Sequence, residues 1–458
     1  MKNFKVIPGS IIAPKGFLAS GVFCDIKRLG TGKGSNKGEK RDLALIVSEV
    51  PANVAGMFTT NQVCAAPVRV CIERVKGGIG QAIVVNSGNA NACTGKQGLA
   101  DAREMAQFTA KQLGLQSKRV LVGSTGRIGV TLPMQNMKRG IVEAAKLLGN
   151  SGQHADQVAE AIMTSDTRPK QIAVEFLLGG KKVRIGGVCK GAGMIQPGMS
   201  ASGGRPAASL KNLHATMLCF ITTDVLISPL ALRQCLHEAV AKSFNRITVD
   251  GDMSTNDTVL ALANGLAENL PLVWVGERDK KEAQKLDGGK QVGWMLRFQA
   301  TLNHVCLELA KMIVRDGEGV SRFVTVRVNG ARNFADAAAA GRAVANSALV
   351  KTSWHGGDPN WGRIIDALGY SPAKIVEGKV DIAYSKPGGS KLLFSLKRGQ
   401  PTKTSFKSLC QIAALKEFDL HINLNLGKAS TVMYAADLTE DYVDFNKGDV
   451  SDPASLGG

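Results

Sequence analysis

The stretch HATMLCFITTD, residues 214–224, governs how the rest of the chain is interpreted. A small residue, Ala215, and a hydroxyl, Thr216, stand at the start of an apolar run. A threonine in such a place is most often an N-cap or a half-buried strand residue. It gains another chemistry if the bond before it is broken, because its own α-amine, with a pKa of about 8, then takes the hydroxyl proton. Thr216 is therefore a candidate for both self-cleavage and nucleophilic catalysis.

Other nucleophile and phosphate motifs are missing around this stretch. KGAGMIQPGM, residues 190–199, is rich in glycine but has neither the P-loop spacing nor a GxGxxG turn within a βαβ unit. The GxSxG elbow is absent in usable form, and none of the six histidines is placed as an obvious base. The sequence therefore argues against a nucleotide loop and against a charge-relay triad.

Three further stretches carry polar groups suited to acyl chemistry or to a charged ligand. GSTGRIG, residues 123–129, offers the Thr125 hydroxyl and the Gly126 amide to an oxyanion, or forms a plain tight turn. RDGEGVSRF places Glu318 between two glycines, where it meets a ligand ammonium or remains a solvated turn acid. ITVDGDMSTNDTVL, residues 247–260, is either a cation site or a turn-rich bend.

Composition bounds the class of protein. The 458 residues, 44% apolar and 21% charged, predict one large or two ordinary domains of a soluble protein. No apolar stretch approaches the ~20 residues of a membrane span, and no secretory signal is visible, so we expect a cytoplasmic location and no membrane partner. Nine scattered cysteines without CxxC pairs indicate free, mostly buried thiols and no metal site.

The net charge of +19 invites a nucleic-acid interpretation. Aromatic residues make up only 5%, and no recognition motif for a groove or for stacked bases is present, so we expect no nucleic-acid partner. Part of the basic excess lies in residues 27–41, which are rich in glycine. We expect this stretch and residues 200–214 to be exposed, flexible loops.

The apolar pattern predicts helices and strands without a repeated βαβ unit. Short β-rich runs that end in turn residues alternate with helical stretches that end in glycine. Strands are expected at 43–50, 81–88, 119–126, 323–330 and 419–427, and helices at 99–114, 137–150, 228–244 and 335–352.

Taken together, these stretches resemble the ornithine acetyltransferase (glutamate N-acetyltransferase) family of the arginine pathway. The resemblance spans nearly the whole chain and rests on long motifs in order: DLALIVSEVPANVAGMFTTNQVCAAPV, VVNSGNANACTGKQG, STGRIG, IMTSDTRPKQ, KGAGMIQPGM, ATMLCFITTD, ITVDGDMSTNDTVLALANG, RDGEGVSRF and SALVKTSWHGGDPNWGRIIDALGYS. It implies an α+β fold, an N-terminal-nucleophile-like αββα sandwich with a smaller C-terminal domain. It also implies self-cleavage into an α chain, 1–215, and a β chain, 216–458.

The resemblance assigns roles to individual positions. Thr216 matches the nucleophile, freed when the bond after Ala215 breaks, and Thr125 and Gly126 match the oxyanion hole. The positions that match substrate contacts are Thr164, Lys190, Thr216, Glu318, Asn446 and Ser451.

The implied reaction moves an acetyl group from N2-acetylornithine to glutamate through an acetyl-enzyme. Acetylornithine carries a carboxylate and an ammonium, to which Lys190 and Glu318 are suitable charged complements. No cofactor is implied, although acetyl-CoA stays open as a second acetyl donor. The family also implies a heterotetramer of two α and two β chains.

Two departures from the family pattern stand out. Fifteen residues, 200–214, separate Met199 from Ala215, where the family runs on without a break. We expect slower or incomplete self-cleavage from this longer loop. The family's tyrosine-containing end is replaced by NKGDVSDPASLGG, which weakens the match of Ser451.

Two alternatives stay open at the level of sequence. A self-cleaved aminopeptidase of the β-peptidase kind shares the nucleophile but releases its product to water. A basic binding protein that keeps the fold without the activity would account for the charge, and it predicts salt-sensitive retention on nucleic acid and no cleavage.

Overall fold

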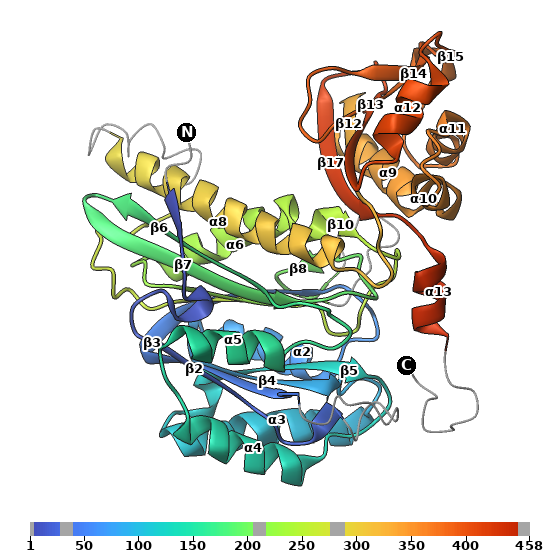
Figure 1. Cartoon of the computed structure of the whole chain (residues 1–458). Helices are drawn as coiled ribbons and strands as arrows, with labels where there is room; N and C mark the ends of the chain where they lie inside the picture. The colour runs from blue at the N-terminus through green and yellow to red at the C-terminus, as the bar shows by residue number, and fades with distance from the viewer. Residues whose placement is uncertain (1–3, 28–39, 205–216, 275–288, 448–458) are drawn as a thin grey trace.

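The computed structural model describes residues 4–27, 40–204, 217–274 and 289–447. Figure 1 shows a main body, built from the N-terminal two thirds of the chain, and a smaller C-terminal lobe beside it. The strands of the main body are β1 (Phe4–Ile7), β2 (Phe17–Val22), β3 (Leu43–Thr59), β4 (Ile79–Asn89), β5 (Val120–Arg127), β6 (Lys170–Leu178), β7 (Lys181–Lys190), β8 (Met199–Ser200), β9 (Leu218–Thr223) and β11 (Thr258–Ala263). Its helices are α2 (Ala66–Val75), α3 (Gly95–Leu113), α4 (Met134–Lys146), α5 (Gly152–Ala161), α6 (Pro229–Lys242) and α8 (Lys290–Arg315), with 3-10 turns η1 (Ser10–Ile12), η3 (Ser117–Arg119) and η4 (Phe244–Arg246).

The strands of the main body form one mixed sheet in the order β1-β6-β7-β9-β11-β3-β4-β5, with β2 and β8 also paired to β3. β11 joins its two halves, since it runs parallel to β9 and antiparallel to β3. β4, β9 and β11 are buried along nearly their whole length, as expected of strands covered on both faces. Polar residues at the ends of these strands therefore come together inside the body.

Helices cover the sheet on opposite sides. In Figure 1, α6 and α8 lie on one side of the strands, and α3 and α4 lie on the other. One apolar core joins β2 to β5 with α3, α4 and α5, and a second joins β6, β7 and β9 with α6 and α8. This arrangement, together with the separate C-terminal lobe, confirms the expected α+β class.

The C-terminal lobe has its own sheet and core. Its sheet runs β10-β17-β12-β16-β13-β14-β15, and a third apolar cluster lies between this sheet and its helices. The strands are β10 (Ile247–Thr248), β12 (Phe323–Ala331), β13 (Asp381–Ser385), β14 (Leu393–Lys397), β15 (Gln400–Pro401), β16 (Glu417–Asn423) and β17 (Ala429–Ala436). The helices are α9 (Phe334–Asn346), α10 (Ala348–His355), α11 (Trp361–Gly369) and α12 (Phe406–Ala413), with η5 (Glu377–Lys379), and the final helix α13 (Glu440–Asn446) leads back toward the main body.

Most of the elements expected from the sequence are present, but several have other bounds: the strand expected over 43–50 continues to Thr59, and the helix expected over 137–150 ends at Lys146. The helix expected over 335–352 is two helices, because Ser347 takes an extended conformation and its hydroxyl accepts from the amide of Val350 at 3.3 Å, capping α10. The strand expected over 419–427 ends at Asn423. Asn425 adopts a left-handed conformation with φ of +51°, which ends the pairing.

The two loops expected to be exposed lie partly outside the described residues. Of the first loop, residues 28–39 fall outside the described ranges. The expectation of exposure is wrong for its first residue, because Lys27 is buried and donates to the carbonyl of Arg41 at 2.6 Å. Burial lowers the pKa of Lys27 to about 8. Of the second, 205–214 fall outside, while Ser200 pairs with Phe58 as part of β8.

All nine cysteines fall within the described residues and none forms a disulfide. Most are buried, as expected, but Cys93 is exposed. Among the helices of the described ranges, none is both long enough and apolar enough to cross a membrane.

Candidate active site

The parallel strands β4 and β5 end at the same edge of the sheet, where the GSTG turn is held by hydrogen bonds. Ser124 donates its hydroxyl to Asn86 Oδ1 at 2.7 Å, and the Asn256 amide donates to the carbonyl of Ser124 at 2.8 Å. Thr125 follows at 1% exposure. The turn therefore has one defined shape, which places the Thr125 hydroxyl inside the body.

Gly126 is required by this turn. Its φ of +128° is a conformation that side chains rarely adopt, and a Cβ there would lie 2.3 Å from the carbonyl carbon of Gly88 on the neighbouring strand. Only glycine fits without moving β4 or β5.

We expect Gly126→Ala to lower kcat at least about tenfold and the free energy of unfolding by about 1–3 kcal/mol, because the added methyl group displaces Thr125 and the neighbouring amide. Steady-state kinetics and urea unfolding measure the two effects. Gly152→Ala is the matched control, since the same methyl group meets nothing within 4 Å at the start of α5. Wild-type turnover by the Gly126 variant would contradict this account of the turn.

Lys190 ends β7 and points its ammonium at the same turn. The side chain is 2% exposed, and Nζ donates to Thr125 Oγ1 at 3.3 Å. Burial lowers the pKa of Lys190, while Asp166, whose Oδ2 is 3.9 Å away, acts in the opposite direction. A threonine hydroxyl that accepts from an ammonium keeps its own hydrogen for another acceptor.

Asp166 brings Thr164 beside Lys190. Its Oδ2 accepts from the amide of Thr164 at 3.0 Å, and its Oδ1 accepts from the amide of Gly191 at 2.7 Å. Burial raises the pKa of Asp166, but Lys190 and Lys170 outweigh it and hold that pKa well below the usual range. Two residues expected to bind substrate thus share one buried carboxylate.

Glu318 and Asn446, two more expected substrate contacts, form a pair beside the glycine-rich loop that follows Lys190. The amide of Glu318 donates to the carbonyl of Ala192 at 2.9 Å, and a Cβ on Gly193 would lie 2.2 Å from its Oε2. Asn446, in α13, donates to that same Oε2 at 3.0 Å. The charge of Glu318 raises the pKa of Lys190, so the two groups interact across the site.

Ala215, Thr216 and Ser451 lie outside the described residues, and their expected roles remain predictions. The described chain resumes at Met217, whose carbonyl accepts from the amide of Thr258 at 3.0 Å. The start of β9 is thereby fixed against β11.

Asp257 is a feature of the site that we did not predict. It is fully buried, and its Oδ1 accepts from the amide of Met217, while its Oδ2 has no hydrogen-bond partner among the described residues. Burial raises the pKa of this carboxyl well above the usual range, although Lys190 acts to lower it. The only signal in the sequence was the polar run STND directly before the apolar strand β11.

Residues 249–257, between β10 and β11, form the bend that one of the two interpretations predicted. Asp250 accepts from the amides of Met194 at 2.6 Å and Ile195 at 2.8 Å, so it shapes the glycine-rich loop. Burial raises its pKa to about 6. Within the described ranges, no group of three or more His, Cys, Asp or Glu side chains could hold a metal ion.

Three serine–histidine contacts elsewhere in the described residues do not form a relay, and one of them, Ser151 with His154, is the capping box of α5. In a relay the serine and the carboxylate bind opposite ring nitrogens. His355 does have Ser321 3.2 Å from Nδ1 and Glu440 2.9 Å from Nε2, but the Ser321 hydroxyl donates its hydrogen to Asp437 Oδ2 and not to the imidazole. His421 meets Ser385, at 2.9 Å, but that hydroxyl donates to the carbonyl of Lys386.

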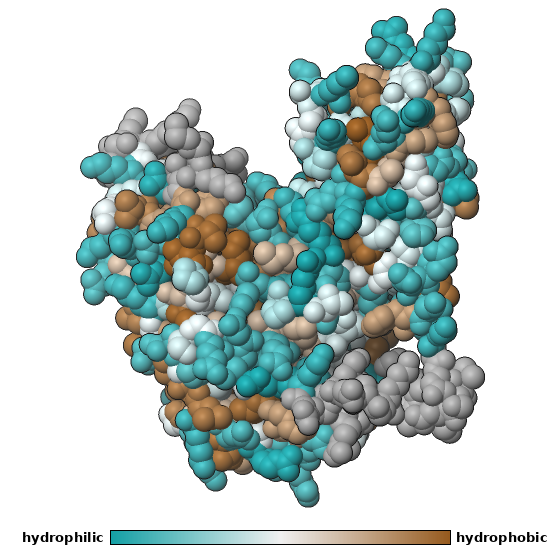
Figure 2. All heavy atoms as spheres, viewed as in Figure 1, coloured by the Kyte–Doolittle hydropathy of each residue, from teal (hydrophilic) through white to brown (hydrophobic). Residues whose placement is uncertain are grey.

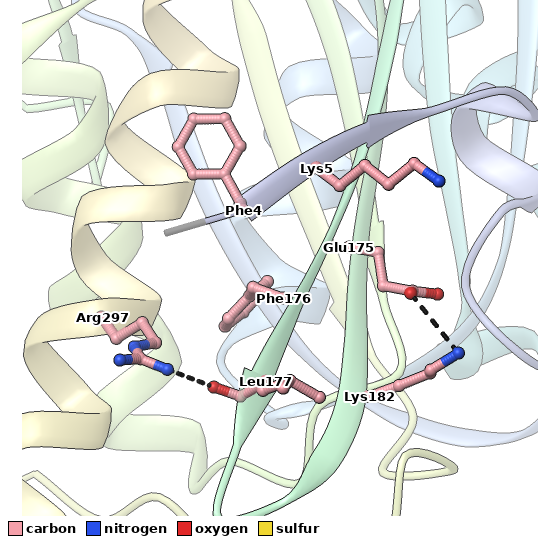
Figure 3. Close-up of a pocket in the computed structure, with 7 residues that line it drawn as sticks. All are labelled: Phe4, Lys5, Glu175, Phe176, Leu177, Lys182 and Arg297. Carbon is pink, nitrogen blue, oxygen red and sulfur yellow. Dashed lines mark hydrogen bonds and ion pairs between the residues drawn. The ribbon is translucent and has the colours of Figure 1, made fainter. Parts of the chain in front are cut away.

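Hollows elsewhere on the surface lack the expected site residues. Figure 3 shows one of about 380 Å³ between β1, the β6–β7 hairpin and α8, where Arg297 donates to the carbonyl of Leu177 and Lys182 lies 3.8 Å from Glu175. Another, of about 450 Å³, lies between α6 and the C-terminal lobe, which stands apart from the body in Figure 2. Neither brings a nucleophile together with an oxyanion donor.

The geometry groups a buried hydroxyl and a glycine turn with a buried ammonium, and a carboxylate lies on the adjoining loop. Comparison with known proteins identifies the family. The model of the ArgJ family matches residues 24–448. The arginine biosynthesis bifunctional protein ArgJ of Symbiobacterium thermophilum is 43% identical over 440 residues, covering 96% of this chain and 98% of that protein. The glutamate N-acetyltransferase of Methanocaldococcus jannaschii is 42% identical over 449 residues, with coverage of 96% and 98%.

Among solved structures, the chain is similar to the ornithine acetyltransferase of Mycobacterium tuberculosis, determined with ornithine. The identity is 36% and the TM-score 0.39, over 43% of this chain and 100% of that one. The chain belongs to the ArgJ family. This confirms the resemblance seen in the sequence and makes the chain an enzyme of arginine biosynthesis, of the glutamate N-acetyltransferase class.

Proposed function

We propose that this chain transfers the acetyl group of N2-acetylornithine to the amine of glutamate through an acetyl ester on Thr216. The observation that carries the proposal is the buried Lys190 ammonium, 3.3 Å from the Thr125 hydroxyl, with the Glu318 carboxylate on the adjoining loop. The name of the Methanocaldococcus jannaschii relative supports glutamate as the acetyl acceptor, and that of the Symbiobacterium thermophilum relative supports a place in arginine biosynthesis.

Thr216 first creates its own base by breaking the chain. Its Oγ attacks the carbonyl carbon of Ala215, the peptide C–N bond breaks, and the acyl group moves from nitrogen to oxygen. Water then hydrolyses this ester, leaving a carboxylate on Ala215 and a free α-amine on Thr216. The products are the α chain, 1–215, and the β chain, 216–458, which we propose assemble as two of each.

Acetyl transfer then runs in two halves. The Thr216 α-amine takes the hydroxyl proton as Oγ attacks the acetyl carbon of acetylornithine. The C–N bond breaks, the proton passes to the departing amine, and ornithine leaves. The neutral amine of glutamate attacks the acetyl ester, N-acetylglutamate forms, and the proton returns to Thr216 Oγ.

The residues around the nucleophile stabilise and orient these species. The Thr125 hydroxyl and the Gly126 turn supply donors to the oxyanion of each tetrahedral intermediate. Lys190 binds the substrate carboxylate and Glu318 the side-chain ammonium of acetylornithine. The proposed contacts that complete the set are Thr164, Asn446 and, beyond the described residues, Ser451.

Burial of the site favours transfer over hydrolysis. Thr125 is 1% exposed and Lys190 is 2% exposed, so water has little access to the hydroxyl and the ammonium. An acetyl ester in such a site persists until an amine arrives. No resident cofactor is part of the proposal, and acetyl-CoA enters only as an alternative acetyl donor.

One set of assays tests the function. The purified protein receives glutamate with acetylornithine, glutamate with acetyl-CoA, or an amino-acyl anilide. We expect N-acetylglutamate in the first assay. Double-reciprocal plots of its initial rate, with acetylornithine varied at several glutamate concentrations, are expected to give parallel lines. The second assay decides whether acetyl-CoA is also a donor. Release of the anilide amine without acetyl transfer would instead establish an aminopeptidase. Intersecting lines in the double-reciprocal plots would contradict the acetyl-enzyme intermediate.

A further inference from the structure

Lys170 carries a charge that the proposed reaction does not use. Its side chain is 1% exposed, and its ammonium lies 2.6 Å from Asp166 Oδ1 and 2.5 Å from Asp316 Oδ2. Asp316 also accepts from the amide of Thr167 at 3.1 Å. Charges removed from water to this degree are costly unless each is paired, so the arrangement demands a reason.

The charges continue in alternating sign into the active site. Asp316, Lys170, Asp166 and Lys190 follow one another, and the separation from Asp166 Oδ2 to Lys190 Nζ is 3.9 Å. Lys190 then donates to Thr125 Oγ1. The series is neutral overall and ends on the hydroxyl proposed for the oxyanion hole.

We propose that Lys170 and Asp166 are positioning residues that hold the Lys190 ammonium against Thr125, so that the Thr125 O–H is turned toward the oxyanion. The inference rests on the proposed function and adds to it a specific role for the buried ion series.

The reason is electrostatic. At low dielectric, an ammonium moves toward the strongest unbalanced carboxylate. Without Lys170, the negative charge of Asp166 is no longer balanced by a neighbouring ammonium. The Asp166 carboxylate then attracts the Lys190 ammonium more strongly and draws it away from Thr125. Without Asp166, the ammonium is left to Asp257 and Glu318.

The two residues act on Lys190 with opposite sign. The charged groups that influence its ammonium are Asp166, Lys170, Glu318 and Asp257. Asp166 raises the pKa of Lys190 and Lys170 lowers it. Because Lys190 is needed as a cation, activity is present below its pKa and lost as pH rises through it.

The experiment compares the pH dependence of kcat, with acetylornithine and glutamate, for the wild type, Asp166→Asn and Lys170→Met. We expect both variants to lose about tenfold or more in kcat at neutral pH. The alkaline limb moves to lower pH in Asp166→Asn and to higher pH in Lys170→Met. Lys242→Met, which removes an exposed lysine paired with Glu238, leaves the profile unchanged.

A role in folding alone does not produce opposite shifts. If Lys170→Met fails to fold, a double variant that combines Lys170→Met with Asp316→Asn is used instead, because it removes one charge of each sign. The alkaline limb of its kcat profile is also expected at higher pH than that of the wild type. Limbs that move together or not at all, in variants of an active wild type, would overturn the inference and leave the proposed function intact. An inactive wild type would overturn the proposed function and this inference with it.

Discussion

Thr216→Ala is expected to remain a single polypeptide and to lose at least about 10⁴-fold in acetyl transfer. The substitution removes the atom that attacks the Ala215 carbonyl and the atom that carries the acetyl group. One change therefore abolishes both events. Denaturing gels and the acetylornithine–glutamate assay measure them on one preparation.

Thr216→Ser is the matched control, because it keeps the hydroxyl and removes only a methyl group. We expect this variant to be cleaved and to retain measurable transfer. An uncleaved Ala variant with wild-type turnover would show that some other group carries the acetyl. A cleaved Ala variant would remove Thr216 from the first step.

Thr125→Ala is expected to lower kcat by about 10²–10³, the loss typical of one oxyanion donor. The loss has two parts, since the variant also leaves the buried Lys190 ammonium without its hydroxyl acceptor. Steady-state kinetics measure kcat, and thermal unfolding measures how much of the change is stability.

Thr109→Ala serves as the matched control for that loss. It removes an equally buried hydroxyl, which bonds the carbonyl of Met105 within α3, away from the site. We expect a small loss of stability and no change in kcat. If the two variants lost activity equally, the effect of Thr125 would be one of folding.

The elements with the clearest local patterns were predictable from the sequence. β3, β4 and β5 are apolar runs that end in turn residues, and α3 ends at Gly114 with a φ of +66°. We did not predict α8, although its buried stripe repeats at helical spacing through Phe298, Leu302, Val305, Leu309 and Ile313. That helix was within reach of the same reasoning.

The supporting shell of the site was not predictable in the same way. Thr125 and Glu318 were candidates from their turns and Lys190 from a family motif, whereas the roles of Lys170 and Asp257 arise from contacts between distant segments. Lys170 meets a carboxylate 146 positions away in sequence, and Asp257 meets the amide of Met217 across paired strands. Such pairings follow from strand order and register, which local periodicity does not specify.

The break at Ser347 shows a different limit. The run 335–352 is rich in alanine and favours helix throughout, and the apolar spacing continues across the break. Asn346 and Ser347 favour caps over helix interiors, and the serine hydroxyl captures the Val350 amide. The capping signal was present but weaker than the surrounding pattern.

The central claim is that the chain makes its own amine-bearing nucleophile and carries the acetyl group on it. The most direct measurement is mass spectrometry of active protein incubated with acetylornithine in the absence of glutamate. We predict a fragment that begins at Thr216 and is heavier by one acetyl group, with the acetyl group lost when glutamate is added. Active protein found only as the intact, unacetylated polypeptide would contradict the claim.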